Sequence, residues 1–407
     1  MRTLAGLTLI AVLALTIQAQ DKSAPTRVDL AAYGVSGHEA AADLAESLGA
    51  RLVLHELDEQ SLPASCWAVR KKATPPAATA LLGQALGCQS LYDPQSATLH
   101  LYRPGAVLGG SKVKGYDVSV LAGRFVEYVN SYGIARQPVK PGEEAEPERT
   151  AAEHLAGVLE EMLWDPRGAE FDASVVGDRL LYTTDENSHS RIREALDLLM
   201  AEHGGESAAL KDERAAVEKL KEAKFSGELT GTPVASVLTE ICAAAGLGVV
   251  LGPEFAEFAC EEHIDFKPEA GSAWEALHSL LVRMREQDIR VDFTVRGDAL
   301  VLESEDAGVG SGYRVYDISD LLKKLEASYQ RQRTAPGKVE GYEGDLRRAG
   351  GNQVVLRSLD EQLEAAHAPG NSDCMVFGNR LIVRGGNSAV NAATQILKEM
   401  GWEEPGK

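Results

Sequence analysis

The chain has 407 residues, enough for about two to four domains, so a single small module is excluded. Hydrophobic residues make up 44% and charged residues 25%, which is typical of folded globular domains and not of fibrous or disordered chains. The 61 Asp and Glu residues outnumber the 41 Lys and Arg residues, giving a net charge of -20. Such a chain repels phosphate backbones, so we expect no nucleic-acid partner.

Residues 1–19 have the features of a secretory signal peptide. Met1 and Arg2 give a cationic start, residues 4–17 are apolar, and small Ala19 precedes a polar segment. A membrane anchor is the alternative, but crossing the hydrocarbon needs about 20 apolar residues. We therefore predict a cleaved signal peptide over 1–19 and a periplasmic or secreted bacterial protein with no membrane span after cleavage.

Three segments of the mature chain recur about 200 residues further on. The pairs are Ala45–Leu54 with Cys242–Leu251, Tyr116–Ser119 with Tyr316–Ser319, and Gly177–Tyr182 with Gly378–Val383. A repeat of this length is too long for a solenoid unit and indicates a duplicated pair of modules, A-B-A-B. We predict an α+β fold class with four small mixed modules, each with helices packed on a small sheet.

The predicted boundaries follow the repeats. Module A covers 27–104 and 225–304, module B covers 115–204 and 313–402, and a helical linker covers 205–224. The linker alternates Lys and Glu, so we expect a solvated helix that joins the two halves.

The first module A reads as a helix ended by Gly49, an apolar strand, a second helix and a hairpin. Thr74 and Pro75 are suited to begin the second helix, as cap and first helical residue. The hairpin turns at 93–96. The first module B then reads as a strand, two helices around a polar loop, a hairpin that turns at Gly177 and Asp178, and a final helix.

The second copies repeat this plan. Thr232 is placed to cap a helix that Gly246 ends, and an apolar strand follows over 247–251. Ser272 and Glu275 form a capping-box pattern that opens a helix with Trp274 inward. Two further hairpins are predicted, turning at 297–298 and at 378–379.

Five cysteines remain after cleavage, and an oxidising compartment allows disulfides. The local pairings are Cys66 with Cys88 and Cys242 with Cys260, each closing a loop of about 20 residues and contributing roughly 3 kcal/mol. Cys374 would then be left over. The alternative, five small buried hydrophobic thiols, stays open because sequence carries no geometry.

No catalytic, cofactor or metal motif is found. The glycines of 246–252 follow a helix and precede a strand, which is the reverse of a dinucleotide-binding loop. The nine His residues lack zinc-site spacing, and no Gly-x-Ser-x-Gly elbow occurs. Arg179 and Arg380 follow matched hairpin turns and are candidate partner contacts, although an exposed hairpin face explains them equally well.

Together the modules resemble the periplasmic N-terminal region of bacterial secretins. Thr232 to Leu302 resembles the STN (secretin and TonB short N-terminal) domain, and Tyr316–Leu322 with Gly378–Val383 resembles the KH-like secretin N-domain. The C-terminal barrel-forming region of that family has no counterpart in this chain. The resemblance implies contacts with periplasmic partners or neighbouring subunits, and no chemistry.

We therefore expect an exported, non-enzymatic protein–protein interaction or scaffolding protein of the cell envelope, without cofactors. Its partners would be envelope proteins or further copies of itself. The alternative is a small-ligand-binding or hydrolytic protein with a site between the two halves, since domain junctions often form pockets.

Overall fold

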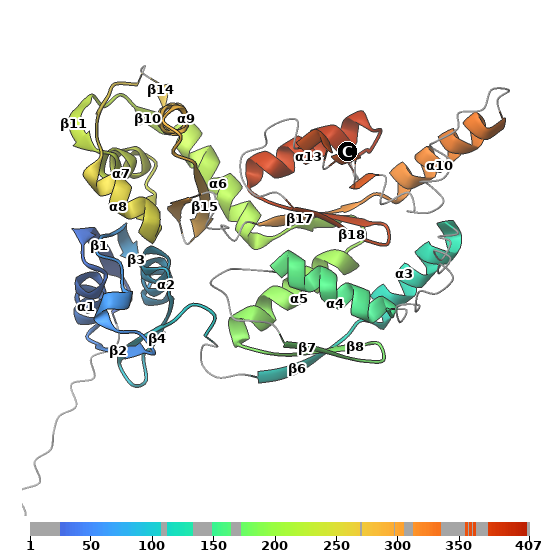
Figure 1. Cartoon of the computed structure of the whole chain (residues 1–407), viewed down its shortest axis with the longest axis horizontal. Helices are drawn as coiled ribbons and strands as arrows, with labels where there is room; N and C mark the ends of the chain where they lie inside the picture. Colours follow the sequence, from blue (N-terminus) through green and yellow to red (C-terminus); the bar gives the residue numbers. More distant parts are fainter. Residues whose placement is uncertain are drawn as a thin grey trace, which may run out of the picture.

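The structure is a computed structural model. It describes residues 25–106, 112–132, 149–163, 172–268, 271–296, 298–304, 312–334, 355–356, 358–359, 361–363 and 373–404. The predicted signal peptide lies outside these residues. The fold class is α+β, with helices packed on several small sheets, as the sequence predicts. Figure 1 shows the two A modules together at one end of the molecule and the two B modules together at the other.

The first module A contains two sheets and two helices. Its elements are β1 (Val28–Val35), α1 (Gly37–Leu48), β2 (Arg51–His55), a 3-10 turn (Glu59–Ser61), β3 (Cys66–Ala73), α2 (Pro75–Leu86), β4 (Gln89–Asp93) and β5 (Thr98–Tyr102). β1 pairs antiparallel with β3, whereas β5 pairs parallel with β2 and antiparallel with β4. Thr74 caps α2 and Gly49 ends α1 in the left-handed conformation, both as predicted.

The second module A has the same pairing scheme, with one extra helix, α8, and one extra pair of short strands, β10 and β14. Its elements are β10 (Lys224–Phe225), β11 (Leu229–Pro233), α7 (Val234–Ala244), β12 (Gly248–Leu251), α8 (Pro253–Glu261), β13 (His263–Phe266), β14 (Gly271–Ser272), α9 (Ala273–Glu286), β15 (Val291–Arg296) and β16 (Ala299–Ser304). The capping box of Ser272 and Glu275 is confirmed. The prediction that Thr232 caps α7 was wrong. Thr232 lies in β11, and the residue before α7 is Pro233, whose side chain makes no capping hydrogen bond.

The two B modules also share the pairing of their strands, with the first and second strands both antiparallel to the third. The first contains β6 (Lys112–Asp117), α3 (Ser119–Tyr132), α4 (Ala151–Leu163), β7 (Asp172–Val176), β8 (Arg179–Thr184), α5 (Glu186–Met200) and β9 (Gly204–Glu206). The second contains β17 (Tyr313–Asp317), α10 (Ser319–Thr334), β18 (Asp373–Phe377), β19 (Arg380–Arg384) and α13 (Asn387–Glu399). Both predicted hairpin turns are confirmed, with Gly177 at φ 61° and Gly378 at φ 59°.

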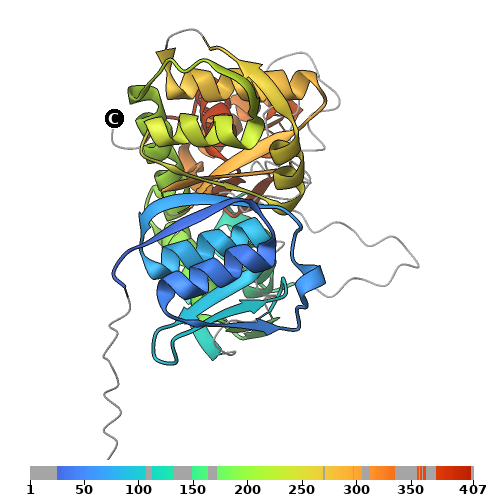
Figure 2. The same ribbon diagram turned by 90° about the vertical axis from the view of Figure 1, so that its left-hand side faces the viewer.

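The first half of the chain covers the sheets of the second half. β3 joins the edge of β12, which makes one five-stranded sheet in the order β1-β3-β12-β16-β15. Figure 2 shows this sheet between the helices of the two A modules. Val250 and Val301 of the second module are buried in the core of the first, beneath α1 and α2. The B modules share a core in the same way, in which Phe377 and Ile382 pack with the helices of the first B module.

The linker is a helix, α6 (Ala208–Glu222), but it is solvated on one side only. Leu210 and Leu220 are fully buried, and Ala216 and Leu220 belong to the core of the second A module. The expectation of a solvated helix was wrong for the face that carries Leu210, Ala216 and Leu220, because the alternating Lys and Glu residues obscure these apolar positions in the sequence. α6 therefore holds the second A module against the second B module.

The joined sheet gives a test of how the two A modules depend on each other. A Cβ atom added at Gly248 would lie 2.6 Å from Val69 O and 3.1 Å from Ala299 Cβ. We expect Gly248→Val to lower the free energy of unfolding by about 1–3 kcal/mol, because the extra atoms overpack the β3–β12 junction. Urea unfolding followed by circular dichroism measures this.

Gly123→Ala is the matched control. The added methyl group meets no described atom within 4 Å, so α3 should be stabilised by up to about 1 kcal/mol. Unchanged stability of Gly248→Val would show that β3 and β12 do not pack as closely as the structure has them.

Candidate functional site

Strands β2 and β12 occupy corresponding places in the two A modules. Gly49 and Gly246 end the preceding helices at φ 64° and 68°, and each strand then pairs parallel with the last strand of its module. Arg51 N donates to Ala97 O, as Gly248 N does to Asp298 O, both at 2.8–3.0 Å. The register of the two strand pairs is therefore the same.

The outer edges of these two strands differ. β12 pairs antiparallel with β3, with Val249 opposite Val69 and Leu251 opposite Trp67. β2 is the terminal strand of its sheet, and no strand of the described chain pairs with its outer edge. Gly248–Leu251 is buried throughout, whereas Leu52, Val53 and Leu54 are only half-buried. β2 is thus an unpaired edge at the position that β3 covers in the second module.

The hydrogen-bonding groups on this edge can be assigned from β12. Gly248 N and Gly252 N both donate hydrogen bonds toward β16. Because the direction of the N–H groups alternates along a strand, the N–H groups of Val249 and Leu251 face β3. The corresponding residues in the first module are Leu52 and Leu54. Their backbone N–H and C=O groups therefore face the open edge, ready for an added strand.

One face of the sheet β2-β5-β4 is also uncovered by the helices of its own module. We call Val53, His55, Leu91, His100 and Tyr102 the open sheet face. His55 Nε2 and His100 Nδ1 lie 2.8 Å apart, and the Tyr102 ring stacks on His55 at 4.3 Å. Burial, and next the neighbouring His55, lower the pKa of His100, which favours an uncharged ring near neutral pH.

The counterpart of this face in the second module is a buried one. Val250 corresponds to Val53 and Val301 to His100, and both valines are 0% exposed beneath the first module. The open sheet face is therefore where a further module would lie if the stacking continued. In the first B module, Val113 and Val176 on the sheet β6-β8-β7 are likewise 68% and 63% exposed. Figure 1 shows both sheets along one side of the molecule.

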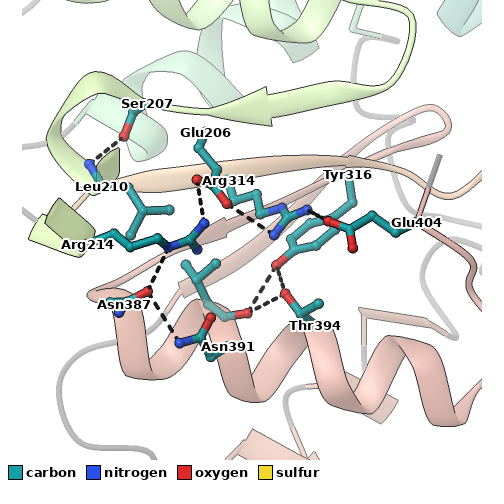
Figure 3. Close-up of polar contacts among 11 residues, drawn as sticks. Glu206, Ser207, Leu210, Arg214, Arg314, Tyr316, Asn387, Asn391, Thr394 and Glu404 are labelled. Atoms are coloured by element: carbon teal, nitrogen blue, oxygen red, sulfur yellow. Dashed lines mark hydrogen bonds and ion pairs between the residues drawn. The ribbon is translucent and has the colours of Figure 1, made fainter. Parts of the chain in front are cut away.

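A polar junction fixes α6 and β9 to the second B module, as Figure 3 shows. Glu206 pairs with Arg214 at 3.0 Å and with Arg314 at 3.1 Å, and Arg314 also pairs with Glu404 at 3.2 Å. The Arg314 guanidinium lies 4.7 Å from the ring centroid of Tyr316. Because β9 also pairs with β17, both backbone and side-chain contacts join the two halves here.

Glu213 caps a helix from another part of the chain. Its Oε1 accepts from Asn387 N, at the start of α13, over 2.6 Å, where the residue before the helix, Gly386, has no side chain to do so. Burial raises the pKa of Glu213 to about 7, and nearby Asp292 adds to the rise. Sequence reasoning missed this residue, because a Glu within a Lys/Glu-rich helix carries no signal of burial.

Beside this junction lies a cavity of about 330 Å³. α6, α9, β15 and α13 form it, with apolar walls that include Trp274, Leu281 and Phe293, and with Glu213 and Asn387 at its polar end. Trp274, which the sequence placed inward, is half-buried at this cavity. A second cavity of about 310 Å³ lies between the two halves and is lined by Arg191, Tyr313 and other mostly polar residues.

The two candidate contact arginines differ. Arg179 is exposed at the start of β8. Arg380 is 4% exposed, pairs with Asp317 at 3.1 Å, and donates to Ala201 O and Glu202 O. These carbonyls follow the end of α5, where a cation satisfies the helix terminus. Arg380 is therefore an internal contact between the B modules, and its assignment as a partner contact was wrong.

All five cysteines are described, and the structure has them as thiols, so neither expected disulfide is formed. Cys66, Cys88 and Cys242 are buried, and Cys260 and Cys374 are partly buried. Burial raises the pKa of Cys66 and of Cys242 to about 12. Such thiols are poor nucleophiles and behave as small apolar side chains.

Comparisons with protein-family models, curated proteins and solved structures give no match. Within the part of the chain that the structure describes, no helix is both long and apolar enough to cross a membrane. The same residues contain no group of three or more His, Cys, Asp or Glu side chains placed to hold a metal ion.

The buried Glu213 predicts a pH dependence of stability. Its pKa is raised from 4.5 to about 7 on folding, so the folded chain binds this proton more tightly than the unfolded chain. Stability is therefore lost as pH rises from about 4.5 to about 7, by roughly 3 kcal/mol. Because a glutamine side chain stays neutral at every pH in this window, we expect Glu213→Gln to gain stability relative to the wild type as pH rises, as measured by urea unfolding.

Glu218→Gln, on the exposed side of the same helix, controls for the loss of a charge from α6. If the wild type and Glu213→Gln showed parallel pH profiles, Glu213 would not be buried against α13 as described.

Proposed function

We propose that the chain is an exported, non-enzymatic interaction or scaffolding protein of the bacterial cell envelope. The unpaired edge of β2 carries this proposal, because the corresponding edge in the second module is occupied by a strand of the same chain. An open edge with half-buried Leu52, Val53 and Leu54 is a template for strand addition. Main-chain bonds would supply affinity and the open sheet face would supply selectivity.

The cell-envelope setting is part of the same proposal. It is supported by the signal-peptide pattern of residues 1–19 and by the resemblance of the paired modules to the periplasmic N-terminal region of secretins. A partner is then an envelope protein, and the net charge of -20 disfavours acidic partners and nucleic acid.

The test is a crosslinking pull-down of the mature chain, residues 20–407, from the envelope fraction of its own source. Val53→Lys should abolish capture of the partner, because docking would bury the charge where the second module has Val250 at 0% exposure. Val120→Lys is the matched control, since Val120 is 58% exposed on helix α3 and lies in neither open sheet, and its capture should equal that of the wild type.

Mass spectrometry identifies both the partner and the crosslinked module. Crosslinks that map to β2 and its neighbours in the wild type support the proposal. Capture that survives Val53→Lys unchanged would move the interaction to another surface, and no specific capture would remove the adaptor function.

Small-ligand binding is a second candidate function, and the cavity lined by Trp274 favours it. Cavities of about 300 Å³ or more with apolar walls and a few polar groups are typical ligand sites. Anilinonaphthalene sulfonate is a suitable probe, since its fluorescence rises on entering an apolar cavity and Lys221 and Arg285 line the same cavity. Leu281→Arg should abolish the fluorescence increase, and an increase that Leu281→Arg leaves intact would show that the probe binds elsewhere.

A further inference from the structure

The docking of the two A modules has a direction. The first module donates strand β3, and the second accepts it on β12. The corresponding acceptor of the first module is β2, which is open, and the corresponding donor of the second module is β13. β13 pairs antiparallel with β11 as β3 does with β1, and its other edge is the end of its two-stranded sheet. The chemistry of β13 decides whether stacking can continue.

The residues of β3 and β13 can be matched by their direction. Cys66 and Ala68 belong to the core of the first module, and Ile264 and Phe266 belong to the core of the second. Side chains alternate along a strand, so the residues on the other face are Trp67 and Val69 in β3. In β13 the corresponding positions are Asp265 and the residue after the strand, Lys267.

These outward positions have opposite chemistry in the two modules. Trp67 and Val69 are 7% and 8% exposed and pack in the core of the second module. Trp67 Nε1 also donates to Thr239 Oγ1 at 2.9 Å. Asp265 is exposed, and the Lys267 side chain is 72% exposed in an ion pair with Glu228. β13 thus carries charges where β3 carries its apolar anchors.

The side chain of an arginine also hydrogen-bonds to the backbone on the outer edge of β13. Val234 N donates to Glu262 O, and by alternation along the strand the carbonyl of Asp265 faces away from β11. Arg283 Nη1 donates to this Asp265 O at 2.8 Å. Arg283 lies eleven residues after the cap of α9, and Ala85, at the same distance from the cap of α2, is 0% exposed. Charged side chains on an edge strand are a common barrier to strand addition.

We propose that the chain is a one-ended docking unit: β2 accepts an antiparallel strand from a different protein, and β13 is closed to docking. The incoming strand would carry large apolar residues at alternate positions, as β3 does with Trp67 and Val69. This inference rests on the proposed function and names the kind of partner. A second copy is disfavoured as the donor of such a strand, because its β3 is already paired, its β13 is guarded, and two chains of charge -20 repel each other.

The test converts the closed edge into a donor. In the donor variant, Asp265→Trp, Lys267→Val and Arg283→Ala reproduce the chemistry of β3 and α2, and Val53→Lys blocks its own acceptor. Mixed with the wild-type chain, it should form a one-to-one complex of about twice the wild-type mass, measured by light scattering after gel filtration. The wild type alone should keep the mass of a single chain.

Val53→Lys without the donor substitutions is the matched control and should not bind the wild type. A folded donor variant that leaves the wild type unbound would overturn the proposal. So would wild-type self-association that Val53→Lys removes. Circular dichroism and urea unfolding establish that the donor variant is folded.

A peptide of residues 64–74, the β3 segment, gives a measurement that does not depend on the folding of the donor variant. It should bind the wild type, and Val53→Lys should weaken this binding about tenfold or more, since a buried unpaired Lys is costly. Absence of peptide binding together with an unfolded donor variant would overturn the proposal as well.

These outcomes are separate from those of the envelope pull-down. If the donor variant binds the wild type but no envelope protein is captured, β2 is an acceptor edge and the adaptor function in that fraction is excluded. Capture that is insensitive to Val53→Lys, with an inert donor variant, would retain an adaptor that uses another surface.

Discussion

The pairing of β3 with β12 is the contact on which the rest of the arrangement depends. Three residue pairs join the two A modules into one sheet, and this places α1 and α2 against the outer face of the second module. Those helices contribute small residues to the shared core, including Ala41, Ala78 and Ala85, all 0% exposed. Larger side chains there would separate the sheets, since interiors are packed to high density. The B modules, linked to the A modules through α6 and the polar junction, stack in the same sense.

Local features were predictable from the sequence because their causes lie within a few residues. The caps at Thr74 and Ser272 and the turns at Gly177 and Gly378 depend on backbone conformations and hydrogen bonds between near neighbours. Thr232 failed for a related reason. It meets the local requirements of a cap, but pairing with Ile264 draws it into β11, and strand pairing is not a local property.

Long-range relations could not be predicted in the same way. The burial of Glu213 and Arg380 depends on α13 and on the end of α5, which are distant in the chain. The sequence nevertheless carries one signal of the strand pairing between the two A modules. Residues 66–69 and 248–251 are apolar without interruption, which is typical of strands covered on both faces, whereas β13 alternates as a half-exposed strand does. Comparing β3 with β13 would therefore have shown that β3 is covered and β13 is not, whereas β2, with consecutive apolar residues at Leu52 to Leu54, gives no such signal.

The connection between β3 and β12 also sets an order of assembly. Trp67 and Val250 belong to opposite halves, so more than half of the chain must be made before the first module can complete its outer layer. Synthesis proceeds from the N-terminus, and contacts between distant segments form slowly. Until β12 arrives, β3 presents an apolar edge with a large indole on it. The nascent first half is therefore expected to be prone to aggregation until its own second half folds and covers this edge.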